Sequence, residues 1–165
     1  MSRKAYAAPN ATRSLNIGLW HELGKSGSPV PVTITLAGDS MRPLIRRGRD
    51  RVTIVPLEGK LRIGDVVLFR GGPERYVVHR VWKMRDDMVQ TFGDNCYNPD
   101  AWIPVSEVWG RVIRFERFGR SWRLDTALSR GWGRLWMAAY PARRVYMKCR
   151  ALAARGYRKI FPKKK

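Results

Sequence analysis

Apolar and polar residues alternate through the middle of this chain. Short β-branched runs carry the period-two pattern, and turns rich in Gly, Pro and Asp separate them. The runs cover residues 30–36, 52–54, 66–69, 77–81 and 108–115. Helical periodicity is nearly absent here. The pattern predicts a mainly β domain with a compact, curled sheet.

After Asp125 the spacing of apolar residues changes to three and four, which predicts helix. Asp125 is the expected N-cap and Pro141 the expected stop, and a second stretch over 145–152 repeats the spacing. The apolar positions of the first stretch are Leu128, Trp132, Leu135, Trp136 and Ala139. We therefore expect a helical C-terminal part.

The chain has 165 residues, the size of one ordinary domain. We predict an N-terminal arm and linker over residues 1–29, with a short amphipathic piece around 15–23. The β core is expected at 30–118 and a basic amphipathic helical tail at 119–165.

The charge balance is strongly basic, with 33 Lys+Arg against 13 Asp+Glu and a formal charge of +20. From Phe118 onward the chain carries fourteen Lys or Arg residues and one acid. Such an excess favours a polyanionic partner. Trp132, Trp136 and Tyr140 among the charges favour the anionic surface of a membrane. Nucleic acid is the less favoured alternative, because no helix-turn-helix, zinc-knuckle or RNP pattern is visible. A third interpretation is that these aromatic residues cover the edge of the β domain.

Cys96 and Cys149 are the two cysteines, and we interpret both as free thiols. No metal or organic cofactor is implied. No apolar run approaches the length of a transmembrane helix, and the N-terminus lacks the apolar core of a secretory signal. The expected location is the cytoplasm, free or peripheral at a membrane surface.

The sequence of residues 38–43 is typical of a turn, and Ser40 near its centre carries a hydroxyl group. Met41 can anchor this turn in the core and Pro43 fixes φ, so the backbone around Ser40 is expected to be stiff. A stiff turn holds Oγ in place and can aim the Ser40 N–H at a developing oxyanion. Gly38 leaves space for a substrate backbone. The alternative is an ordinary surface turn, which uses the same residue types.

His79 lies in an apolar strand, and the loop that follows carries two carboxylates, Asp94 and Asp100. An imidazole near its reference pKa of about 6.5 needs little adjustment to act as a base at neutral pH. A carboxylate beside it would fix its tautomer and stabilise its charged form. The alternatives are a packed core histidine and two turn-forming aspartates, and spacing alone does not choose the aspartate that meets the ring.

Five blocks in this order resemble the signal peptidase I and LexA-type serine peptidases of the S24/S26 group. The blocks lie at 38–43, 63–69, 78–81, 93–100 and 108–112, and the resemblance covers residues 32–116. It implies a curled β-barrel core. Most bacterial members have a lysine at the position of His79. A histidine there is similar to the archaeal and endoplasmic-reticulum branch, which uses an aspartate six residues after that of the Gly-Asp-Asn block.

The resemblance implies the roles of individual residues. Ser40 is the expected nucleophile and His79 its base. Asp100 is expected to orient His79, with Asp94 ordering the loop. Gly38 and Met41 flank the oxyanion and substrate site, and small residues are the expected preference before the cleaved bond. The chain departs from the family where Cys96 replaces a frequent asparagine and where Arg49 is inserted after Gly48. We also expect it to lack the N-terminal membrane anchor that is usual in signal peptidases.

The sequence therefore predicts a serine endopeptidase that cuts a leader, signal-type or preprotein peptide by a Ser-His-Asp mechanism. Two alternatives stay open. One is a LexA-like regulator that cleaves itself. The other is an inactive module that binds a peptide, a membrane or nucleic acid on the same fold. No oligomeric state is predicted.

Overall fold

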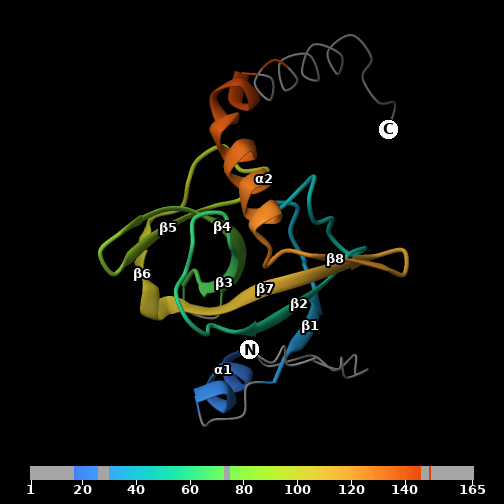
Figure 1. Cartoon of the computed structure of the whole chain (residues 1–165), viewed down its shortest axis with the longest axis vertical. Helices are drawn as coiled ribbons and strands as arrows, with labels where there is room; N and C mark the ends of the chain where they lie inside the picture. Colours follow the sequence, from blue (N-terminus) through green and yellow to red (C-terminus); the bar gives the residue numbers. More distant parts are fainter. Residues whose placement is uncertain (1–16, 26–29, 73–74, 146–148, 150–165) are drawn as a thin grey trace, which may run out of the picture.

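One antiparallel sheet forms the body of the protein (Figure 1), as the computed structural model of residues 17–25, 30–72, 75–145 and 149 describes it. The strand order is β1-β2-β7-β3-β4-β5-β6, and β8 pairs with β7. The elements of this part are β1 (Val32–Thr35), β2 (Arg51–Pro56), β3 (Val66–Arg70), β4 (Tyr76–Arg85), β5 (Met88–Phe92), β6 (Trp102–Pro104), the 3-10 turn η1 (Val105–Glu107), β7 (Val108–Arg117) and β8 (Arg120–Arg123).

The mainly β prediction is confirmed, whereas the sheet is not closed into a barrel. Among the described residues, β1 pairs only with β2 and β6 only with β5, so both edges of the sheet stay open. The five predicted runs all form strands. The period-two pattern missed β6 and β8, because β6 has three residues and all four residues of β8 are exposed.

The core lies on both faces of the sheet. Val66 and Leu68 of β3 pack into one cluster with Met41, whereas Val67 and Phe69 pack into the other. Successive residues of a strand point to opposite faces, so this uninterrupted apolar run marks a strand that is covered on both sides. β3 pairs with β4, the strand that carries His79, and therefore fixes the position of β4.

The C-terminal helix α2 (Ala127–Ala138) crosses over the sheet and packs against β4 (Figure 1). Its N-cap is Thr126, whose Oγ accepts from the Ser129 N–H at 3.1 Å, and not Asp125 as predicted. Asp125 instead accepts two hydrogen bonds from Arg123. The predicted tail region therefore begins as strand β8 before the helix starts.

α2 ends at Ala138, just before Pro141 as predicted. Pro141 does not end the helical region, however, because helical turns resume from Tyr140 to residue 145. Proline lacks an N–H but is tolerated in the first turn of a helix, where that donor has no partner in the helix. The second predicted stretch, 145–152, lies almost entirely outside the described residues.

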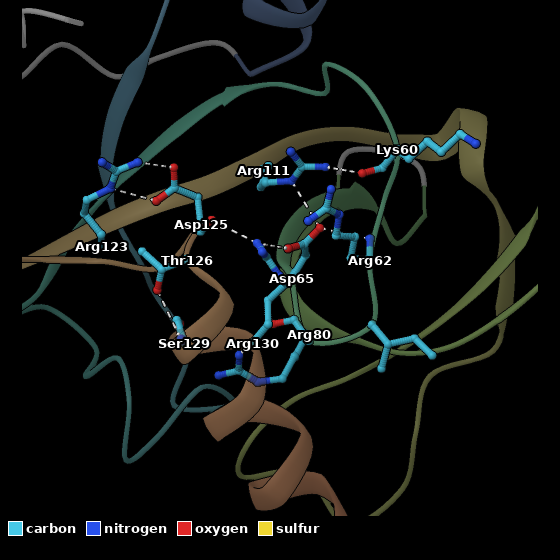
Figure 2. Close-up of polar contacts among 12 residues, drawn as sticks. Lys60, Arg62, Asp65, Arg80, Arg111, Arg123, Asp125, Thr126, Ser129 and Arg130 are labelled. Carbon is cyan, nitrogen blue, oxygen red and sulfur yellow. Dashed lines mark hydrogen bonds and ion pairs between the residues drawn. The ribbon is translucent and has the colours of Figure 1, made fainter. Parts of the chain in front are cut away.

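A buried carboxylate, Asp65, joins α2 to the sheet (Figure 2). It is 3.5 Å from Arg130 of α2 and 3.2 Å from Arg111 of β7. Gly64 has φ +98°, and a Cβ there would lie 2.7 Å from the Arg130 carbonyl oxygen. A side chain at position 64 would therefore push the first turn of α2 away from β4.

The N-terminal amphipathic piece forms α1 (Ile17–Lys25). Trp20 is 6% exposed, packs into the core, and donates its indole N–H to the Val30 carbonyl at 2.7 Å. This part of the predicted arm therefore docks on the β core. No helix of the described residues has the length and apolarity to cross a bilayer.

Candidate active site

The Ser40 turn is held in place by its buried neighbour Met41. Met41 is fully buried, and its carbonyl accepts the Ile45 N–H at 2.9 Å. The Arg42 N–H bonds to the Asp39 carbonyl at 3.2 Å, which closes the turn around Ser40. Met41 is therefore an anchor of the turn, and its side chain is not exposed to a substrate. Gly38 is exposed, with open space where a Cβ would stand.

A buried ion pair holds the end of this loop. Asp50 accepts from Arg117 of β7 at 2.5 and 3.0 Å and from Arg49 at 3.1 Å. Burial raises the pKa of Asp50, but these bonds and the Arg46 N–H outweigh burial and lower the pKa to about 2. Arg117 also donates to the Leu44 carbonyl at 2.7 Å. Arg49, the inserted residue, is thus one of the partners of Asp50, the buried carboxylate that stiffens the loop.

His79 lies on β4 and is 6% exposed. Its Nδ1 lies 2.6 Å from Asp100 Oδ2, the same oxygen that accepts from the Thr91 hydroxyl at 2.6 Å. The Asp100 backbone is held as well, since its N–H bonds to the Thr91 carbonyl and its carbonyl accepts from Gln90. Asp100, and not Asp94, is therefore the carboxylate that contacts the imidazole. Thr91 is a partner that sequence reasoning missed.

The other ring nitrogen of His79 faces the Ser40 turn. A Cβ placed on Gly93 would lie 2.9 Å from His79 Nε2 and 2.9 Å from the Ser40 carbonyl oxygen, so these two atoms flank the same point. Asn95 ties the two loops together, because its N–H bonds to the Ser40 carbonyl at 2.7 Å and its side chain to the Asp39 carbonyl at 3.2 Å. Residue 93 must be glycine for this approach.

Among the described residues, the side chain in hydrogen-bond contact with His79 Nε2 is Cys96, whose Sγ lies 4.0 Å away. Within the described residues, no hydrogen bond joins Ser40 Oγ to His79. Burial lowers the pKa of His79, but the Asp100 hydrogen bond, with Cys96 and the Asp100 charge, raises it to about 9. The resting imidazole is therefore protonated at neutral pH, above the titration near 6.5 that the sequence suggests.

Asp94 binds Arg80 instead of His79. The guanidinium donates to both Asp94 oxygens, at 2.9 and 2.8 Å, and both side chains are almost fully buried. Arg80 also donates to the Gly64 carbonyl at 3.0 Å. A Cβ on Gly133 of α2 would lie 2.5 Å from the guanidinium, so α2 covers this pair closely. Asp94 therefore orders the loop from the opposite side of β4.

The end of α2 and the turn after it hold the same loop through its backbone. Trp136 and Arg143 both donate to the Asp94 carbonyl, at 3.1 and 2.8 Å. The Tyr140 hydroxyl donates to the Tyr97 carbonyl. Arg143 also lies 4.5 Å from the centre of the Trp136 ring. The three hydrogen bonds join residues more than forty positions apart, so no local pattern in the sequence predicts them.

Two of the hollows on the described surface are defined by the residues that line them. The larger, of about 410 Å³, lies between α1 and β7, is lined by His21, Pro56 and Trp109 among others, and does not include His79. The smaller, of about 190 Å³, borders Asp94, Pro43 and Trp136 beside the Ser40 turn. Neither of these hollows is lined by Ser40, His79 or Asp100. Groups that could hold a metal ion are absent from the described residues.

No protein-family model matches the chain.

Proposed function

We propose that this protein is a serine endopeptidase of the signal peptidase I-like type, with Ser40, His79 and Asp100 as its catalytic residues. The observation that carries the proposal is the 2.6 Å contact between His79 Nδ1 and Asp100, with Nε2 turned toward the Ser40 turn. A carboxylate on Nδ1 fixes the tautomer that leaves Nε2 to exchange a proton with a nucleophile.

In the proposed reaction, Ser40 Oγ attacks the carbonyl carbon of the substrate. His79 Nε2 takes the hydroxyl proton and returns it to the leaving amine, and the Ser40 N–H donates to the oxyanion. Water then releases the acyl group by the same route. The hydrogen bond between Ser40 and His79 has to form when substrate binds, as catalytic hydrogen bonds often tighten only then.

The proposed substrate is an extended peptide with a small residue before the cut bond, in a leader or preprotein. The outer edge of β1 has no strand partner among the described residues, and β1 runs directly into the Ser40 turn. An extended peptide can add to such an edge through main-chain hydrogen bonds. Gly38 is exposed beside this path and offers no side chain to block it.

Attachment to an anionic membrane surface is part of the proposal. Leu128, Trp132 and Leu135 of α2 are 85%, 58% and 63% exposed and recur at helical spacing. The chain around them carries the basic excess from Phe118 onward. An exposed apolar stripe within a basic segment suits the headgroup region of an anionic bilayer.

The test is cleavage of a proteome-derived peptide library, with new termini read by mass spectrometry. Wild-type protein is expected to produce termini preceded by small residues, and Ser40→Ala to produce none. Ser121→Ala, in exposed strand β8, is the matched control. Identical cleavage by wild type and Ser40→Ala would refute the proposal. A fragment generated from the purified chain alone would favour the self-cleaving regulator.

A further inference from the structure

We infer that Cys96 is a reactive thiol coupled to His79, and that its oxidation by a small hydroperoxide switches the site off. The inference rests on the contact between this sulfur and a buried imidazole. Cys96 Sγ lies 4.0 Å from His79 Nε2, and the imidazole itself is more than nine-tenths buried, with no hydrogen-bond partner on Nε2 other than this sulfur among the described residues. The buried nitrogen is thus aimed at the thiol.

The arrangement is a thiol, an imidazole and a carboxylate in sequence. Asp100 holds Nδ1 from behind, so the positive charge of the imidazolium stays on the ring beside the sulfur. A positive imidazolium stabilises negative charge on sulfur, and a thiolate is the form that attacks electrophiles. Cys149, the other cysteine, is exposed and serves as an internal comparison.

The loop geometry restricts the attacking partner to small molecules. Cys96 is only partly exposed, and a Cβ on Gly93 would lie 2.5 Å from its sulfur. Hydrogen peroxide is small enough to reach a sulfur in this setting. The thiolate sulfur attacks one peroxide oxygen, the S–O bond forms as the O–O bond breaks, and the released hydroxide takes up the proton that the thiol has given up, to become water. Sulfur is oxidised by two electrons to sulfenic acid while the peroxide is reduced.

Oxidation would occupy the nitrogen that the proposed peptidase needs. The new oxygen on Sγ stands in the short space toward Nε2 and can hydrogen-bond to it, which keeps that nitrogen from the Ser40 hydroxyl. A thiol reductant reverses the sulfenic acid and frees the ring. This switching step rests on the proposed function, whereas the reactivity of the thiol does not.

The test treats the full chain with hydrogen peroxide at pH 7, traps sulfenic acid with dimedone, and compares the Cys96 and Cys149 peptides by mass spectrometry. Cys96 is expected to be trapped at least about five-fold faster than Cys149, although it is less exposed. His79→Asn and Asp100→Asn should each abolish this advantage while the Cys149 rate stays constant. Slower trapping of Cys96, or an advantage that survives both substitutions, overturns the inference.

The switch itself is tested on a peptide that the wild type cleaves. Peroxide should abolish cleavage, a reductant should restore it, and Cys96→Ser should cleave in the presence or absence of peroxide. Loss of cleavage in Cys96→Ser under peroxide would reject the switch. If no peptide is cleaved by any version, the peptidase proposal fails while the trapping comparison still decides the reactivity of Cys96.

Discussion

His79 and Arg80 are neighbours on β4, yet each binds a different carboxylate of the same loop. His79 takes Asp100 at 2.6 Å on one face of the strand, and Arg80 takes Asp94 with two hydrogen bonds on the other. Alternation of side chains along a strand produces this division. One pair has the chemistry of a catalytic site, and the other fixes the loop that supplies its carboxylate.

Stability should depend on pH through His79. The folded-state pKa of about 9 lies above the ordinary 6.5, so protonated His79 contributes stability that is complete below pH 6.5 and lost as pH rises through 9. The full loss is about 3 kcal/mol by the shift in pKa. Urea unfolding between these pH values should show this decline in wild type and not in His79→Gln. Equal slopes in both proteins would contradict the assignment.

Breaking the Arg80–Asp94 pair should destabilise the fold strongly. Arg80→Met leaves a buried carboxylate without its partner, which costs about 3–5 kcal/mol in the free energy of unfolding. Arg85→Met is the matched control, because the Arg85–Asp86 pair is exposed and worth less than about 1 kcal/mol. Urea denaturation measures both. A similar small effect for the two variants would show that the buried pair is not structural.

The end of α2 should control the mobility of the loop at residues 93–98. Trp136→Phe removes one donor to the Asp94 carbonyl and keeps most of the ring, at a cost of about 1 kcal/mol. Faster amide hydrogen exchange is expected for Asn95 and Cys96, with little change in β3. Trp132→Phe, on the exposed face of the same helix, is the control. Unchanged hydrogen exchange in Trp136→Phe would show that the end of α2 does not control the mobility of this loop.

The exposed stripe of α2 should bind anionic lipid. Replacing Leu128 and Trp132 with serine is expected to weaken binding to vesicles containing phosphatidylserine by about ten-fold or more, through lost apolar burial. Unfolding stability should change little, because both side chains are exposed. Neutral vesicles provide the comparison. Equal binding of wild type to neutral and anionic vesicles would refute the electrostatic part of this attachment.

Local patterns in the sequence were sufficient for the strands that carry His79 and for the position of the Ser40 turn. Strand periodicity and turn chemistry act over a few residues, so they can be read directly. The choice of Asp100 came from family resemblance, since Asp94 is equally acidic. Its Thr91 contact depends on how β5 meets the following loop, which no short-range pattern contains.

The end of the helix was harder to predict for a related reason. Pro141 is a helix breaker in isolation, but here it falls in the first turn of a new helical segment. The links from Trp136 and Arg143 to the Asp94 carbonyl depend on the docking of α2 over β4. Such long-range contacts depend on how α2 packs against the sheet, and this packing exists only once the whole sheet has formed.

The most direct measurement is the single-turnover cleavage rate of the best library peptide as a function of pH, in wild type, Ser40→Ala and Asp100→Asn. The wild-type rate should rise with pH and level off near 9, as His79 loses its proton. Asp100→Asn should lower the plateau by about 10⁴-fold, and Ser40→Ala should show no cleavage. Undiminished cleavage by Ser40→Ala would contradict the account.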